Sequence, residues 1–235
     1  MNTLLKVENL QAYYGKSHIL HGVNLTVHAG EVVALLGRNG VGRSTMLKAI
    51  MGLVAAQGNI SFKDQAILGL KTFQIAMAGI GYVPENRAIF ADLTVEENLL
   101  LGQKASINNA TMWQCEDVFA LFPILKERLH TRAGVLSGGE QQMLSLSRSV
   151  LGNPELILID EPTEGLAPQV VAQLERFFLR LKERGVAILL VEQKLQLALK
   201  VADRFVLMGQ GREVFVGDKH QFLENDSLRN EWLAV

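Results

Sequence analysis

Short apolar stretches separated by polar turns occupy the first third of the chain, and most have the length and composition of β-strands. The run VVALLG, residues 32–37, is continuously apolar, which predicts a buried strand. It leads into a glycine-rich loop, after which STMLKAIMGL places Met46, Leu47 and Ile50 on adjoining faces of a helix. The other strands predicted in this region are Leu4–Leu10, Ile19–Val27, Gly58–Phe62 and Gly79–Val83.

The chain changes character between about residue 85 and residue 150, where helical signals replace strand signals. Thr94 stands three residues before Glu97, which is the pattern of a capping box at a helix start. The segments ATMWQCEDVFALF (residues 110–122) and SGGEQQMLSLSRSVLG (residues 137–152) are also predicted to be helical. We expect this block to be a helical subdomain inserted into a core of residues 1–84 and 151–235, within one domain of 235 residues.

After residue 150, predicted strands alternate with predicted helices. The strands are LILID (156–160), AILLVE (187–192), RFVLM (204–208) and REVFVG (212–217), and the helices are Gln169–Arg184 and Leu195–Ala202. Such alternation is typical of a mainly parallel sheet covered on both faces, so the sequence predicts an α/β fold.

The composition is that of a packed globular protein, with 49% hydrophobic and 20% charged residues. A formal net charge of -1 gives no electrostatic reason to expect nucleic acid or an acidic membrane surface as a partner. Cys115 is the only cysteine, so no internal disulfide can form, which fits a reducing cytosolic setting. The apolar runs are too short to span a bilayer, and no secretory signal is recognisable. We therefore expect any membrane association to come through a partner.

The loop GRNGVGRST matches the phosphate-binding pattern G-x-x-x-x-G-K-[ST], except that Arg43 occupies the lysine position. The glycines let the backbone turn its N–H groups towards an anion, and the following helix adds the positive end of its dipole. Ser44 can place a hydroxyl on Mg²⁺, and Arg43 keeps a positive charge near the outer phosphates. The alternative is a glycine-rich turn without a ligand. The expected nucleotide-binding residues are Gly37, Arg38, Asn39, Gly40, Val41, Gly42, Arg43, Ser44 and Thr45.

The string LILIDEP, residues 156–162, ends a buried strand with two acids. Asp160 and Glu161 would lie at the C-terminal edge of the sheet, where α/β proteins bind ligands. Asp160 can hold Mg²⁺ through water, and Glu161 can act as general base on an attacking water. The alternative is a solvated turn after a strand.

The string LSGGEQQ, residues 136–142, is a second anion-binding pattern. Ser137 opens a helix, and Gly138 and Gly139 expose backbone N–H groups at its start. The alternative is an ordinary capped helix. It would account for the helix but not for this particular sequence of residues.

Together these strings resemble the ATP-binding cassette ATPases, the nucleotide-binding subunits of ABC transporters. GRNGVGRS resembles the Walker A motif, LSGGEQQ the family signature and LILIDE the Walker B motif, in the family's order across nearly the whole chain. The resemblance implies ATP and Mg²⁺ as ligands. It also implies a phosphate-loop ATPase core with a mainly parallel sheet, an N-terminal antiparallel β-subdomain and an inserted helical subdomain.

The resemblance also implies roles for individual residues. Tyr14 would stack on the adenine, the alternative being a half-buried strand tyrosine. Asp160 would take the metal-associated role and Glu161 that of the general base. Ser137–Gly139 would contact the γ-phosphate of ATP bound to an opposite subunit, so the active unit would be a head-to-tail pair.

Four positions depart from the general family pattern: Arg43, Glu85 in place of a glutamine, Gln193 in place of the switch histidine, and Ala167 in place of an aspartate. The last three resemble the branch that serves branched-chain amino acids, urea and short amides. Glutamate can still approach Mg²⁺ at position 85, and the Gln193 amide can donate to a γ-phosphate oxygen. The planar fork of Arg43 cannot take the position of a lysine without shifting. We expect Mg²⁺-ATP binding and turnover to persist, because the backbone N–H groups do not depend on that side chain.

These features predict an ATP-hydrolysing importer subunit at the cytoplasmic face of the inner cell membrane. The expected partners are two permease subunits and either a sister ATPase or a second copy of this chain. A periplasmic binding protein would deliver a branched-chain amino acid or a related amide, and no nucleic acid is expected. Two alternatives stay open: a regulatory cassette that binds ATP without hydrolysing it, and an importer of urea or a short amide. A soluble cassette ATPase acting on chromosomes or ribosomes is disfavoured, because this sequence has neither a long coiled-coil insertion nor a duplicated cassette. The cargo is not fixed, because its specificity lies in other chains.

Overall fold

The computed structural model describes residues 2–103 and 112–233, and an antiparallel sheet forms much of the N-terminal part. The strand order in this sheet is β2-β1-β4-β5, with the long strands β1 and β2 paired as a hairpin. The alternating burial along β1 directs one face of the sheet to a core, as expected for a half-buried strand. The strands are β1 (Thr3–Tyr14), β2 (Ser17–His28), β4 (Ala55–Phe62) and β5 (Gln65–Ala66).

A second, larger sheet runs through the centre of the molecule in the order β10-β9-β3-β8-β7-β6. Its neighbouring strands are parallel except for the antiparallel pair of β9 and β10 at one edge. The predicted α/β fold with a mainly parallel sheet and an N-terminal antiparallel sheet is therefore confirmed. The strands are β3 (Val32–Leu36), β6 (Ile80–Val83), β7 (Leu156–Asp160), β8 (Ala187–Val191), β9 (Arg204–Gly209) and β10 (Arg212–Asp218).

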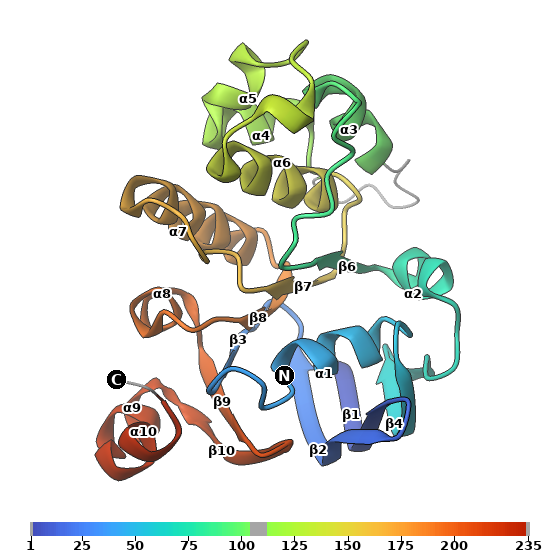
Figure 1. Ribbon diagram of the computed structural model, residues 1–235, viewed down its shortest axis with the longest axis vertical. Helices are drawn as coiled ribbons and strands as arrows, with labels where there is room; N and C mark the ends of the chain where they lie inside the picture. The colour runs from blue at the N-terminus through green and yellow to red at the C-terminus, as the bar shows by residue number, and fades with distance from the viewer. Residues whose placement is uncertain (1, 104–111, 234–235) are drawn as a thin grey trace.

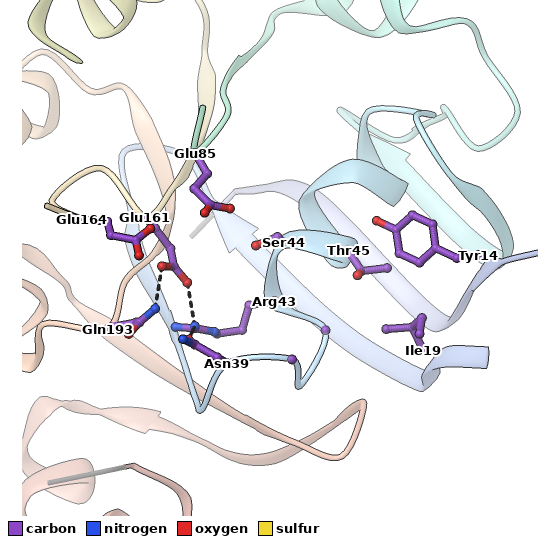
Figure 2. A pocket seen from close by; sticks show the side chains of 12 residues that line it. Tyr14, Ile19, Asn39, Arg43, Ser44, Thr45, Glu85, Glu161, Glu164 and Gln193 are labelled. Carbon is purple, nitrogen blue, oxygen red and sulfur yellow. Dashed lines mark hydrogen bonds and ion pairs between the residues drawn. The ribbon is translucent and has the colours of Figure 1, made fainter. Parts of the chain in front are cut away.

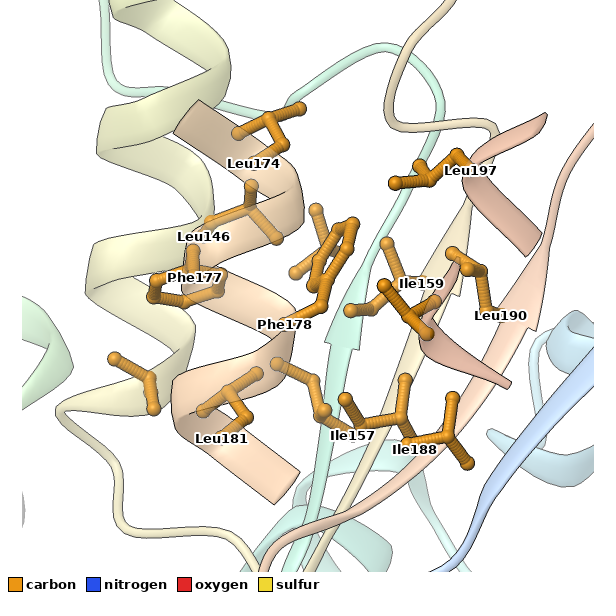
Figure 3. Close-up of a cluster of buried hydrophobic side chains, with 14 of the residues drawn as sticks. Leu146, Ile157, Ile159, Leu174, Phe177, Phe178, Leu181, Ile188, Leu190 and Leu197 are labelled. Carbon is orange, nitrogen blue, oxygen red and sulfur yellow. The ribbon is translucent and has the colours of Figure 1, made fainter. Parts of the chain in front are cut away.

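The two faces of the central sheet belong to two different hydrophobic cores. Val33 and Leu35 of β3 pack with the antiparallel sheet and with α1 (Arg43–Ile50). Ala34 and its even-numbered neighbours point to the other face, as side chains on a strand must. There they join a core that includes α7 (Pro168–Glu183), α8 (Leu195–Val201) and α6 (Gly138–Val150). Figure 3 shows this core at β7, where Ile157 and Ile159 lie beside Phe178 of α7.

Helices α3 to α6 gather at one end of the molecule, above α7 in Figure 1. Phe177 joins α7 to this group, because its ring centroid lies 5.2 Å from that of Phe122 and 6.2 Å from that of Trp113. Arg184 stacks over Trp113 at 4.2 Å and forms an ion pair with Asp117. The remaining helical segments are α2 (Thr72–Ala78), α3 (Val95–Gly102), α4 (Cys115–Leu121), α5 (Pro123–Glu127), a 3-10 turn (Ala133–Val135), α9 (Lys219–Glu224) and α10 (Asp226–Trp232).

Most predicted elements are present, with shifted ends. The capping box of α3 is confirmed: the Thr94 hydroxyl accepts from the Glu97 N–H at 3.2 Å, and the Glu97 carboxylate accepts from the Thr94 N–H at 2.8 Å. The prediction of helix throughout 110–122 is wrong, because α4 begins only at Cys115; residues 110 and 111 lie outside the described residues. Sequence patterning also missed α2 and α5, which have one buried residue each and hence no apolar stripe.

The contacts of Phe177 predict that Phe177→Ala lowers the free energy of unfolding by about 3–5 kcal/mol, because it leaves a cavity between α7 and the helical end. Leu179→Ala provides the control on the same helix, since Leu179 is 37% exposed, and should change it by less than about 0.5 kcal/mol. Denaturant unfolding measures both. Equal effects at the two positions would contradict the packing described for Phe177.

Candidate nucleotide-binding site

The glycine loop joins the C-terminal end of β3 to the first residue of α1. Gly37 and Gly42 are in left-handed conformations, and a Cβ atom there would lie 2.5 Å from the Met208 carbonyl oxygen and 2.6 Å from Leu20, respectively. Glycine is therefore required for the close approach of the loop to its surroundings. Among the described residues, no side chain caps the first turn of α1, so its N–H groups are available to an anion in the loop.

A pocket of about 320 Å³ opens beside this loop, and Figure 2 shows the side chains around it. It brings together residues from β1, the loop, the segment after β6 and the ends of β7 and β8. Ile19 and Glu164 also line it and were missed by sequence reasoning. The full lining is Tyr14, Ile19, Asn39, Gly40, Gly42, Arg43, Ser44, Thr45, Glu85, Glu161, Glu164 and Gln193.

Several predicted site residues do not line this pocket. The side chain of Arg38 is exposed, while Gly37 and Val41 lie elsewhere in the loop. Asp160 is only 1% exposed and lies behind Ser44, whose hydroxyl donates to its Oδ1 at 2.8 Å. The loop thus surrounds the pocket mainly with Asn39–Thr45, and Asp160 reaches it through Ser44.

The donor set around Asp160 fits Mg²⁺. Burial raises the pKa of Asp160, although the Ser44 hydroxyl bond opposes this rise. A cation beside the carboxylate would offset the cost of its burial. The Ser44 hydroxyl and the nearby Glu85 carboxylate are hard oxygen donors, which suit Mg²⁺. Among the described residues, no group of three or more His, Cys, Asp and Glu side chains could hold a metal alone. Such a sparse donor set is typical of Mg²⁺ sites completed by water and phosphate oxygens.

Glu161 has an unusual backbone conformation, with φ of 45°, directly after β7. Strain of this kind in a residue with a side chain is common at functional sites. Its two carboxylate oxygens have different partners: Oε1 accepts from Arg43 Nη2 at 2.7 Å, and Oε2 accepts from Gln193 Nε2 at 2.6 Å. Burial raises the pKa of Glu161, and the charge of Arg43 opposes that rise. The carboxylate is therefore oriented on both sides at the pocket wall.

Arg43 is almost fully buried, with 3% of its side chain exposed. Besides Glu161, its guanidinium donates from Nη1 to the Glu192 carbonyl at 3.0 Å and from Nη2 to Asn39 Oδ1 at 3.1 Å. Burial lowers the pKa of Arg43, and the neighbouring carboxylates oppose this effect. The group at the lysine position thus extends across the pocket floor to the acid at the end of β7, as the dashed lines in Figure 2 show.

Glu192 was missed by sequence reasoning, although it holds the turn that carries Gln193. It is 2% exposed, and its Oε1 accepts from the backbone N–H groups of Gln193 at 2.8 Å and Lys194 at 2.9 Å. Its Oε2 accepts from the Thr163 hydroxyl at 2.9 Å. The available signal was an acid at the end of AILLVE, which parallels Asp160 at the end of LILID.

The signature residues form the start of α6 and do not line the pocket. The Ser137 hydroxyl accepts from the Glu140 N–H at 3.3 Å, which leaves the helix start capped as predicted. A Cβ atom on Gly138 would lie 3.0 Å from Arg87 Nη1, and one on Gly139 would lie 2.9 Å from Val170. Both glycines therefore allow close packing at the start of α6. Within one chain, the predicted phosphate contacts of Ser137–Gly139 and of the loop belong to separate surfaces.

A buried strand, a glycine loop and an acid at the end of another strand of the same sheet define a phosphate-loop nucleotide-binding protein. The chain belongs to the ABC transporter family, whose family model matches residues 20–164. The predicted family is thereby confirmed, and with it the prediction that the chain is an ATPase.

Similar proteins cover nearly the whole chain. The high-affinity branched-chain amino acid transport ATP-binding protein BraG of Pseudomonas aeruginosa is 41% identical, over 98% of this chain and 100% of its own length. The lipopolysaccharide export system ATP-binding protein LptB of Haemophilus influenzae is 31% identical, over 99% and 98%. A crystal structure of the ADP conformation of an ABC transporter ATP-binding cassette superposes with a TM-score of 0.80 at 27% identity, covering 96% of this chain and 94% of that one.

Within residues 2–103 and 112–233, no helix is long and apolar enough to cross a membrane.

The burial of Asp160 predicts that Asp160→Asn stabilises the nucleotide-free protein at pH 7 by about 1–2 kcal/mol. A raised pKa means that the folded protein loses stability as the pH rises above the ordinary carboxyl value of 3.8 and through the raised value. The gain should therefore shrink as the pH falls from 7 towards the ordinary carboxyl value of 3.8. Thermal unfolding with a chelator present measures it.

The exposed Asp92 supplies the control for this prediction, since Asp92→Asn should change stability by less than about 0.5 kcal/mol at either pH. If Asp160→Asn is less stable than the natural protein at pH 7, burial does not govern the energetics of this carboxyl group.

Proposed function

We propose that this chain is the ATP-hydrolysing subunit of an importer for branched-chain amino acids or related amides. The observation that carries the proposal is the Glu161 carboxylate, which is oriented from two sides at the wall of a pocket that the glycine loop borders. The cargo is proposed because BraG, named for branched-chain amino acid transport, is more similar to this chain than LptB, named for lipopolysaccharide export. Urea or a short amide is the alternative cargo.

In this proposal the loop N–H groups and Thr45 bind the phosphates of ATP, and Tyr14 stacks on the adenine. Ser44, Asp160 and Glu85 hold Mg²⁺, which supplies charge neutralisation at the phosphate oxygens. Glu161 accepts a proton from the attacking water.

Gln193 orients the Glu161 carboxylate and donates to a γ-phosphate oxygen. Gly37, Arg38 and Val41 do not line the pocket, so they contribute through the backbone of the loop.

The proposed active unit contains two cassettes, with Ser137, Gly138 and Gly139 of one facing the ATP of the other. Either a sister ATPase or a second copy of this chain can provide the opposite cassette. Two permease subunits would dock near Glu85, where Phe90 is 50% exposed, and residues of about 85–150 would act as the helical subdomain. The complex would sit at the cytoplasmic face of the inner membrane and receive cargo from a periplasmic binding protein.

A second candidate is a cassette that binds ATP and does not hydrolyse it. The contact of Arg43 with Glu161 favours it, because this contact occupies one oxygen of the general base. The oriented second oxygen favours hydrolysis instead, since a site without turnover needs no positioned base.

Glu161→Gln should lower the ATPase rate of the complete transport complex by about 10²–10⁴-fold, because an amide cannot accept the proton from water. ATP binding should be retained. Glu155→Gln is the matched control at the other end of β7, where the carboxylate is exposed, and should keep full turnover. The rate is measured in proteoliposomes containing both permeases, the partner cassette and the loaded binding protein.

Cargo uptake is measured in the same vesicles with leucine, urea and a short amide in parallel. ATP binding without turnover in the natural complex would establish the regulatory cassette instead. Turnover stimulated by urea and not by leucine would correct the cargo and leave the enzyme class intact.

Tyr14→Ala should weaken ATP binding by about tenfold, because aromatic stacking on a base contributes roughly 1–3 kcal/mol. Tyr14→Phe should keep the affinity, since the ring is retained. Tyr13→Ala provides the control on the preceding residue of β1, where the ring stacks on His18 at 4.4 Å and does not line the pocket. Calorimetric titration with ATP and with GTP measures the three variants. Equal effects at positions 13 and 14 would contradict the proposed role of Tyr14.

A further inference from the structure

We propose that Arg43 is a positioning residue that holds the general base in the nucleotide-free protein and releases it when triphosphate binds. In the free state Arg43 occupies Oε1 of Glu161; in the bound state phosphate oxygens replace that carboxylate as partners of the guanidinium. The inference rests on the proposed function in assuming that this pocket binds ATP, and it concerns only what Arg43 does there.

The geometry of Arg43 explains how one side chain can serve both partners. Both Nη2 hydrogens are used, one by Asn39 Oδ1 and one by Glu161 Oε1, and Nη1 donates once to the Glu192 carbonyl. A guanidinium has five N–H donors, so two are left without a partner among the residues that the structure describes. These donors, beside a pocket lined by the glycine loop, can meet an arriving phosphate before the contact with Glu161 breaks.

The charges around Arg43 favour such an exchange. Arg43 and Glu161 are a nearly buried ion pair, with 3% and 10% of their side chains exposed, so neither group can be left without a counter-charge at small cost. Triphosphate brings several negative charges, and its oxygens match the planar guanidinium fork in two-point contacts. The phosphate groups therefore compete with the Glu161 carboxylate for Arg43, and their greater negative charge favours them.

Gln193 keeps Glu161 in place during this exchange. Its amide donates to Oε2 at 2.6 Å, and its own backbone is fixed by Glu192. Loss of the Arg43 contact therefore frees Oε1 for a water molecule without freeing the whole side chain. A lysine would need all three N–H donors of its single nitrogen to hold Asn39, Glu192 and Glu161, which would leave none for an arriving phosphate.

The exchange predicts an energetic coupling between positions 43 and 161 in nucleotide binding. We would measure the affinity of the full-length chain for a non-hydrolysable ATP analogue with Mg²⁺, in the natural protein, Arg43→Gln, Glu161→Gln and the double variant. Glu161→Gln should tighten binding about tenfold more when Arg43 is present than in the Arg43→Gln background. The reason is that the ion pair with Glu161, which nucleotide must break, exists only in proteins that retain Arg43.

Glu164→Gln separates this effect from general electrostatics. Glu164 is an exposed acid that lines the same pocket, and no contact between it and Arg43 is found among the described residues. Its substitution should change the affinity by the same factor in both backgrounds. Coupling of less than about twofold at 43 and 161, or equal coupling at 43 and 164, overturns the inference.

A structure of the natural chain with the analogue gives a second measurement that does not depend on the variants folding. The inference expects Arg43 to contact phosphate oxygens and Oε1 of Glu161 to be free of Arg43. An unchanged contact between Arg43 and Glu161 in the bound state overturns it, while leaving the proposed function intact. If the natural chain does not bind the analogue at all, the proposed function fails and the inference fails with it.

Discussion

The two adjacent carboxylates at the end of β7 impose the main electrostatic constraint on this molecule, because both must be compensated inside the fold. Consecutive residues at the start of α1 supply the partners: Arg43 contacts Glu161, and Ser44 contacts Asp160. Two neighbouring contacts thereby fix the start of one helix to the end of one strand. The glycine loop, the oxygens of Ser44 and Asp160, and the carboxylate that we propose as general base are consequently held together.

This frame depends in turn on the alternation of side chains along the central sheet. All five residues of β3 and all five of β7 are buried, because one face packs on the antiparallel sheet and α1 while the other packs on α6, α7 and α8. A polar side chain in the middle of these strands would be buried without a hydrogen-bond partner, so polar groups are found only at the strand ends. The site is therefore located where the two cores end.

Local patterns account for what could be predicted from the sequence. The strand, loop and helix around Gly37–Thr45 and the cap of α3 depend on residues close together in the chain. The partner of Arg43 could not be predicted, because it lies 118 residues away and is chosen by the packing of β7 against α1. Glu192 was missed for the same reason, because it accepts a hydrogen bond from Thr163, which lies 29 residues earlier in the chain.

The packing of Arg87 against Gly138 has a consequence for timing between two active sites. Glu85 lines the pocket of its own chain, and two residues later Arg87 contacts the start of the signature helix, while Ser145 of that helix donates a hydrogen bond to the Arg87 carbonyl. In a pair of cassettes, this three-residue span would connect one chain's own nucleotide to the surface that meets its neighbour's. A change at one nucleotide would then be transmitted through Glu85–Arg87 to the other, so that the two catalytic cycles would be synchronised.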